Sequence, residues 1–136
     1  MRRLALLSVL AFGLAACGGS SASKGPLTIT FGFRSGTSGF SVPPSITIAP
    51  DGKVRSNTKP PVNRPALTTA RERALSELVR NRFGALKSEE CPGTSPGQPS
   101  TFIAALGKTV TVRGSCEPAF TKLWNALLHA LFKPSQ

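Results

Sequence analysis

Few side chains in this 136-residue chain have the chemistry of a catalytic or metal-binding group. The candidates are three cysteines, Cys17, Cys91 and Cys116, the single histidine His129, and the carboxylate pair Glu89–Glu90. A cysteine nucleophile needs a histidine base beside it, and a zinc site normally needs four ligands. Carboxylates at adjacent positions do not normally face each other, so they make a poor acid–base pair. We therefore expect no catalytic residue and no metal site.

Motifs of common enzyme classes are also absent from the sequence. The chain has no GxSxG, HExxH, P-loop or paired-glycine dinucleotide motif. Its net charge of +11, from 17 Lys and Arg against 6 Asp and Glu, is spread along the chain. Neither an RNP-like aromatic motif nor a zinc finger accompanies the charge, so we expect no nucleic-acid partner. The sequence predicts a protein that is not an enzyme and has no cofactor.

The first sixteen residues have the pattern of an export signal. Arg2 and Arg3 precede a run of mostly apolar residues, 4–16. This run is too short for a helix that spans about 30 Å of hydrocarbon, which needs roughly 20 residues. It fits the apolar part of a secretory signal peptide. An ordinary signal peptide that happens to contain a cysteine, an uncleaved anchor and a twin-arginine signal are the alternatives.

The signal ends in Leu14-Ala15-Ala16-Cys17, which resembles the lipobox of bacterial lipoproteins. In that family the cysteine receives a diacylglyceryl group, and cleavage between Ala16 and Cys17 makes the cysteine the new N-terminus. Two acyl chains anchor a protein stably, whereas one binds reversibly. The resemblance implies a protein anchored by its lipid to the cell membrane and facing the extracytoplasmic side. Residues 17–26 would be a flexible tether, and residues 27–136 a single extracytoplasmic domain.

Export also bears on the two remaining cysteines. Exported proteins fold in an oxidising compartment, where disulfides persist. Because acylation uses Cys17, Cys91 and Cys116 have only each other as an intramolecular partner, and we expect them to form a disulfide. Closing a loop of about 25 residues stabilises a domain by roughly 3 kcal/mol in the chain-entropy model. A catalytic thiol and a pair of metal ligands are the alternative roles.

Alternation of apolar and polar residues predicts the β-strands of the domain. The predicted strands are 27–33, 45–49, 53–56, 101–106 and 109–113. A turn is predicted at Pro50-Asp51-Gly52 and a two-residue hairpin loop at Gly107-Lys108. Residues 87–100 are expected to form an irregular loop. The expected core face of the last hairpin consists of Phe102, Ala104, Val110 and Val112.

Apolar stripes with helical spacing predict two helices, at 68–83 and 118–132. Thr69 and Glu72 have the spacing of a capping box for the first helix, and Gly84 is its expected C-cap. Trp124 lies in the stripe of the second helix, where core packing and a ligand-stacking role are both open. The order β-β-β-α-β-β-α favours an α+β fold, in which both helices pack on one face of an antiparallel sheet of four to five strands.

Several of these segments together resemble the emfourin-like family. They are Leu27–Phe33 before a Gly/Ser loop, Ile46–Ile48 before Asp51-Gly52, Leu67–Leu86, and Thr109–Val112 before a Leu-rich last helix. Members of that family are small α+β proteins that inhibit thermolysin-type metalloproteases. This chain departs from the family pattern in its lipobox, in its Cys91/Cys116 pair and in Gln98, where an Asp is expected. The resemblance implies the α+β fold and an inhibitor of an exported protease.

The function expected from the sequence is that of a lipid-anchored, non-catalytic binding or inhibitor module with an envelope protein as its partner. The candidate binding loop joins the first two strands, where two glycines permit close approach and two prolines restrict the backbone. Its candidate residues are Arg34, Gly36, Gly39, Phe40, Pro43 and Pro44. An ordinary surface connection is the alternative for this loop. For the whole domain, the alternative is a basic surface that binds anionic lipid headgroups or acidic cell-wall polymers.

Overall fold

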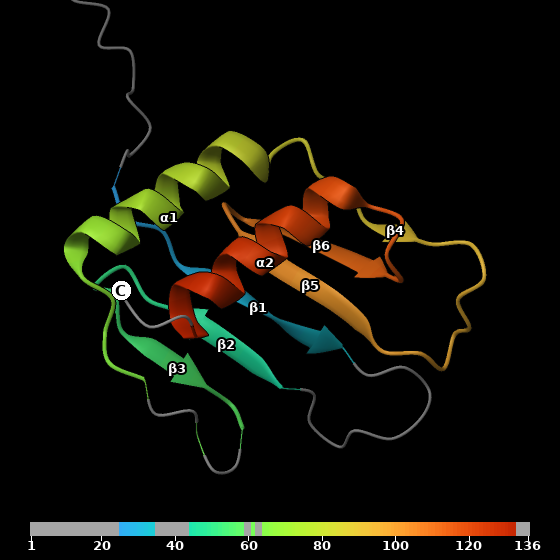
Figure 1. Cartoon of the computed structure of the whole chain (residues 1–136), viewed down its shortest axis with the longest axis horizontal. Helices are drawn as coiled ribbons and strands as arrows, with labels where there is room; N and C mark the ends of the chain where they lie inside the picture. Colours follow the sequence, from blue (N-terminus) through green and yellow to red (C-terminus); the bar gives the residue numbers. More distant parts are fainter. Residues whose placement is uncertain (1–24, 35–43, 59–60, 62–63, 133–136) are drawn as a thin grey trace, which may run out of the picture.

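The computed structural model describes residues 25–34, 44–58, 61 and 64–132 (Figure 1). These residues form one six-stranded sheet, in the order β3-β2-β1-β5-β6-β4, and two helices. The α+β class predicted from the sequence is confirmed. The strands are β1 (Ile29–Arg34), β2 (Ser45–Ile48), β3 (Val54–Ser56), β4 (Glu89–Glu90), β5 (Ser100–Ala105) and β6 (Lys108–Arg113), and the helices are α1 (Thr69–Arg82) and α2 (Pro118–Phe132).

Strand β4 is the element that the sequence analysis missed, because residues 87–100 were predicted to be an irregular loop. It pairs in parallel with β6, so the sheet is mixed rather than purely antiparallel. The pairing continues on both sides of β4, where the Thr111 amide donates to Ser88 Oγ at 3.0 Å and the Cys91 amide donates to the Arg113 carbonyl at 2.9 Å. Two glutamates carry no alternation of apolar and polar side chains, so nothing local predicts this strand.

Both helices lie on the same face of the sheet, and the core fills the space between the two layers (Figure 1). The alternation in β1 places Ile29 and Phe31 on this face, where both are buried. The apolar stripes predicted for the helices are confirmed as the residues that meet the sheet. These buried residues are Leu75, Val79 and Phe83 at α1, and Phe120, Leu123, Leu127 and Leu131 on α2.

The caps of α1 differ from the predicted ones. Thr68, not Thr69, is the N-cap, and its hydroxyl accepts from the Arg71 amide at 3.3 Å. The Glu72 carboxylate accepts from Ser76 Oγ at 2.6 Å instead of closing a capping box. Phe83 is the C-cap in a right-handed conformation, and Gly84 does not have the positive φ of an αL cap. The helix therefore ends by packing Phe83 into the core.

The β5–β6 hairpin turns one residue earlier than predicted. Leu106 and Gly107 have φ of 53° and 70°, the pattern of a type I′ turn, and Ala105 pairs with Lys108. Ile103 and Ala105 are the buried residues toward the helices, so the predicted core face of this strand was wrong. Side chains of neighbouring strand residues point to opposite faces, so Phe102 and Ala104 lie on the face away from the helices. The predicted burial of Val110 and Val112 in β6 is confirmed.

The turn before β3 contains a glycine that no other residue can replace without strain. Gly52 has φ of +80°, and a Cβ there would stand 2.5 Å from the Leu67 carbonyl oxygen. We expect Gly52→Ala to lower the free energy of unfolding by about 2 kcal/mol or more, because it adds a left-handed penalty to a clash with backbone. Denaturant unfolding measures the change. Gly84→Ala is the control, since a Cβ at Gly84 meets nothing within 4 Å; equal effects of the two substitutions would contradict this account.

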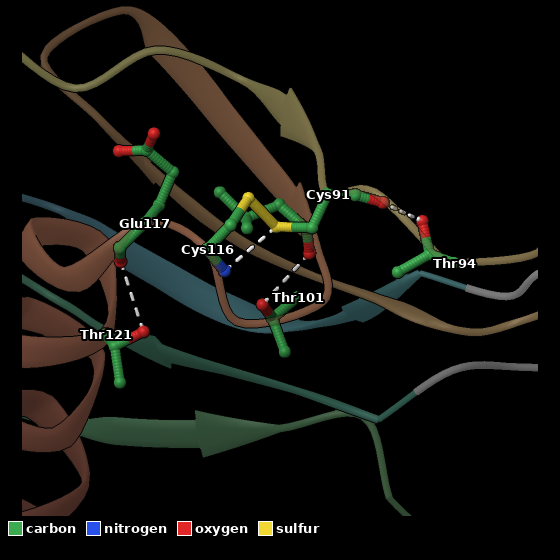
Figure 2. Close-up of a disulfide and its surroundings, with 7 residues drawn as sticks. Cys91, Thr94, Thr101, Cys116, Glu117 and Thr121 are labelled. Carbon is green, nitrogen blue, oxygen red and sulfur yellow. Dashed lines mark hydrogen bonds between the residues drawn. A yellow bond between two sulfur atoms is a disulfide. The ribbon is translucent and has the colours of Figure 1, made fainter.

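The two cysteines of the domain lie at disulfide distance (Figure 2). The Sγ atoms of Cys91 and Cys116 are 1.98 Å apart and their Cα atoms 5.5 Å apart, so the predicted pairing is confirmed. The bridge joins the end of β4 to the start of α2, and the Cys116 amide also donates to Cys91 Sγ at 2.9 Å. Gly114 permits this approach, because a Cβ there would lie 2.7 Å from the Cys91 Cβ.

Candidate functional site

The strongest candidate for a binding site is an apolar hollow of about 240 Å³ between α2 and the adjoining parts of β1 and β2. We call it the aromatic pocket. It lies on the helix side of the sheet, at the end of β1 that leads into residues 35–43. Its lining residues are Phe31, Gly32, Phe33, Pro44, Ser45, Ile46, Thr58, Trp124, Leu128 and Phe132.

Four aromatic rings form a connected cluster at the pocket. The centroid of Trp124 lies 5.3 Å from that of Phe31 and 5.7 Å from that of Phe33, both in edge-to-face contact. Phe120 stacks against Trp124 from within α2, at 6.3 Å and an interplanar angle of 19°. Edge-to-face pairs of this kind stabilise a packed arrangement beyond the area they bury. The Trp124 ring is therefore held in a defined position at the pocket wall.

The periodicity of two elements explains why these residues meet. In β1, Phe31 and Phe33 are two positions apart and so share the helix face. In α2, Trp124, Leu128 and Phe132 follow one another at intervals of four residues and so form one stripe along the helix. The stripe runs beside the fully buried residues of α2 and reaches the edge of the core. As a result Trp124 is only partly buried, and Phe33 and Phe132 are 41% and 39% exposed.

A positive charge lies at the rim of the aromatic pocket. The Arg64 guanidinium stands over the Phe132 ring, 4.6 Å from its centroid, in a cation–π contact. The two ion pairs among the residues that the structure describes are Lys53–Asp51 and Arg113–Glu90, and neither involves Arg64. The pocket thus combines apolar walls with an exposed guanidinium at its edge.

The structure brings only part of the predicted binding loop to this pocket. Pro44 lines it, and its carbonyl accepts from the Phe33 amide at 2.9 Å. Arg34 ends β1 on the opposite face of the sheet, where its guanidinium lies 5.3 Å from the Phe102 ring centroid. The other four loop candidates, Gly36, Gly39, Phe40 and Pro43, lie outside the described residues, as do Ala16 and Cys17.

A second hollow, of about 330 Å³, lies at the other end of β1. Its lining includes polar side chains, and its buried carboxylate is already satisfied. Glu72 accepts from Ser76 Oγ, which in turn accepts from the Leu27 amide at 3.0 Å. Arg80 donates to the Gly25 carbonyl, so α1 holds the start of the described chain from two positions. We interpret this region as the place where the segment before β1 is fixed to the domain.

At the rim of this second hollow, Asp51 accepts from the Lys53 amide at 3.0 Å. This hydrogen bond holds the pKa of the exposed Asp51 carboxyl below its ordinary value. The predicted role of Asp51 in a turn accounts for both the hydrogen bond and the lowered pKa. Within the described ranges, no group of three or more His, Cys, Asp or Glu side chains is placed to hold a metal ion.

Sequence reasoning missed the aromatic pocket because it placed Phe33 only on a half-buried strand and left Trp124 open between core packing and a ligand-stacking role. A partial signal was present: Phe33 is the last apolar residue of the β1 alternation, and Trp124, Leu128 and Phe132 share a stripe. His129 is exposed on α2. In the part of the chain that the structure describes, neither helix is long and apolar enough to span a bilayer.

We compared the chain with models of known protein families, with curated proteins and with solved structures, and none of them matches it.

Proposed function

We propose that this protein is a lipid-anchored lipoprotein of the cell envelope, and that its domain binds a segment of an exported protein in the aromatic pocket without catalysing a reaction. The observation that carries the proposal is the pocket itself, with ordered aromatic walls and two partly exposed phenylalanines. Its occupant would place an apolar side chain in the hollow, against the Phe33 and Trp124 rings. A carboxylate beside that side chain would pair with Arg64.

The chemistry of the pocket supports a protein partner. Binding energy at protein interfaces concentrates in a few aromatic and arginine residues that fill or line well-packed pockets. Here Trp124 is fixed by three ring contacts, so little conformational freedom is lost when a partner binds. A pocket of about 240 Å³ is large enough for one apolar side chain and small for a whole cofactor.

The position of the pocket supports the proposed anchor. Gly25, where the segment after Cys17 enters the domain, is held by α1 at the start of β1. The pocket lies toward the far end of the same strand, and six residues of a strand extend roughly 20 Å. A domain held to the membrane through Gly25 therefore presents its pocket away from the attachment point.

Retention of envelope proteins by the acylated protein tests this function. We expect Phe33→Ala to lower the affinity for the retained partner about 30-fold, because truncation of a central aromatic anchor typically costs about 2 kcal/mol. Phe102→Ala is the matched control, since Phe102 pairs with Gly32 beside Phe33 but lies on the opposite face of the sheet. Arg64→Gln should weaken binding less, and mainly at low salt.

The pull-down is done at low and high salt, and thermal unfolding of each variant confirms that it is folded. A partner that is retained at high salt by the wild type and by Phe102→Ala, and lost with Phe33→Ala, supports the proposal. Equal loss with both phenylalanine variants, or no retained protein, contradicts it. The family resemblance names a thermolysin-type metalloprotease as the first partner to assay, with inhibition by the wild type and weaker inhibition by Phe33→Ala as the expected result.

A further inference from the structure

We propose that a hollow on the face of the sheet away from the helices binds one sugar ring of a neutral saccharide. The hollow has a volume of about 200 Å³ and lies where β4 and β6 meet the start of β5, and we call it the β4 hollow. Its lining residues are Ser88, Glu89, Glu90, Ser100, Thr111 and Arg113. The site is separate from the aromatic pocket, which lies on the helix side of the sheet, so either proposal can fail without the other.

The register of the sheet brings the polar side chains of the β4 hollow together. In β6, Val112 is buried toward the helices, so its neighbours Thr111 and Arg113 point to the opposite face. Arg113 pairs with Glu90 in β4, which lies beside β6 (Figure 1). Ser88 stands just before β4, where its Oγ accepts from the Thr111 amide at 3.0 Å. Backbone pairing therefore fixes the positions of these groups before any ligand binds.

Hydrogen-bond donors and acceptors face the same small space in the β4 hollow. Three hydroxyls, from Ser88, Thr111 and the 4% exposed Ser100, are able both to donate and to accept. The Arg113 guanidinium only donates, and the two carboxylates only accept. A ligand hydroxyl matches both kinds of partner, because it donates one hydrogen bond and accepts others. A sugar ring carries several hydroxyls on neighbouring carbons, so it fits this mixed lining.

Arg113 is the most enclosed charged group of the β4 hollow. Its side chain is 18% exposed, against 75% for that of Glu90. One terminal nitrogen donates to Glu90 Oε1 at 2.6 Å, whereas the Nε–H is buried and has no hydrogen-bond partner among the described residues. A guanidinium has five N–H donors, and a buried donor without a partner is uncommon in proteins. Arg113 thus has donors left for the oxygen atoms of a ligand, while Glu90 holds the guanidinium in place.

Other classes of ligand fit the β4 hollow less well. Two carboxylates against one guanidinium disfavour a phosphate or carboxylate ligand, because like charges repel. In the described part of the chain, no group of three or more His, Cys, Asp or Glu side chains is placed to hold a metal ion. The volume corresponds to roughly six water molecules at about 30 Å³ each. A sugar ring replaces such water with direct hydrogen bonds to the same groups.

The test titrates the full acylated chain in detergent micelles with neutral tetrasaccharides of N-acetylglucosamine, glucose or galactose, and follows the binding by NMR. With at least one of them we expect saturable shifts of the Thr111 and Arg113 amides and of the Arg113 Nε–H. Thr109 lies two positions from Thr111 on the same face but outside the hollow, so its amide should shift much less. The tetramer of galacturonic acid, which adds a carboxylate to each galactose ring, should bind more weakly than the best neutral tetramer.

Two matched pairs of variants show whether the β4 hollow itself makes the contact, and thermal unfolding confirms that each variant is folded. Thr111→Val should weaken binding about fivefold, whereas Thr109→Val should leave it unchanged. Glu90→Gln should weaken binding about tenfold, because a charged acceptor is lost. Glu77→Gln on α1 changes the net charge equally and should have no effect. The absence of saturable shifts with every neutral tetramer, equal effects within either pair, or tightest binding of the galacturonate would overturn the inference.

Discussion

Replacing Cys17 by serine is expected to yield a chain that carries no lipid and keeps its first sixteen residues. In the lipoprotein family that the signal resembles, the thiol is the acceptor of the diacylglyceryl group, and a hydroxyl does not replace it. Each buried CH₂ of an acyl chain contributes about 0.8 kcal/mol to membrane binding, so the loss of two chains removes stable anchoring. Intact-mass measurement and detergent-phase partitioning of the purified protein detect both changes.

Fractionation alone does not decide this result, because an uncleaved apolar segment also binds membranes. The mass distinguishes the two cases: the wild type should begin at Cys17 and carry lipid, and the variant should begin at Met1 without lipid. A double variant, Cys91→Ala with Cys116→Ala, is the control and should be acylated like the wild type. An unmodified, uncleaved wild-type chain would show that the prediction is wrong.

Loss of the Cys91–Cys116 disulfide is expected to lower the free energy of unfolding by about 3 kcal/mol, because the bridge closes a loop of 25 residues. For a domain of this size the change corresponds to a fall in Tm of roughly 12–24 °C. The physical reason lies mainly in the unfolded chain, which gains freedom when the cross-link is absent. In the folded state, the bridge holds the two-residue strand β4 beside β6 and close to the start of α2.

Thermal unfolding of the Cys91→Ala, Cys116→Ala double variant with and without a reducing agent measures this effect. The reducing agent should lower the Tm of the wild type to near that of the double variant, and it should leave the double variant unchanged. Both cysteines are replaced together so that no free thiol remains in the domain. Identical unfolding of the oxidised wild type and the double variant would contradict the account.

The parts of the fold that the sequence predicted are those with a strong local pattern. In β1 the apolar residues alternate without interruption, and Ile29 and Phe31 on one face of the strand are buried as expected. In α2 the apolar stripe that contains Phe120, Leu123, Leu127 and Leu131 predicted which face of the helix packs on the sheet, and these four residues are buried. The class of fold follows from such elements, because two amphipathic helices and an alternating sheet bury their apolar faces together.

The parts that the sequence did not predict depend on partners distant in the chain. The strand at Glu89–Glu90 exists because β6 and the disulfide are beside it. In β5, both faces carry apolar residues, so Phe102 was as plausible a core residue as Ile103 until the hairpin register was known. The aromatic pocket was missed for a related reason: the exposure of Phe33 and Trp124 depends on how far α2 extends over the sheet.

The most direct test of the central claim is photo-crosslinking in the intact envelope, with a photoreactive phenylalanine analogue in place of Phe33 or, as the control, Phe102. These positions lie on neighbouring strands but on opposite faces of the sheet. The account predicts a specific crosslinked protein from position 33 and none from position 102. No product from position 33, or the same product from both positions, would contradict binding in the aromatic pocket.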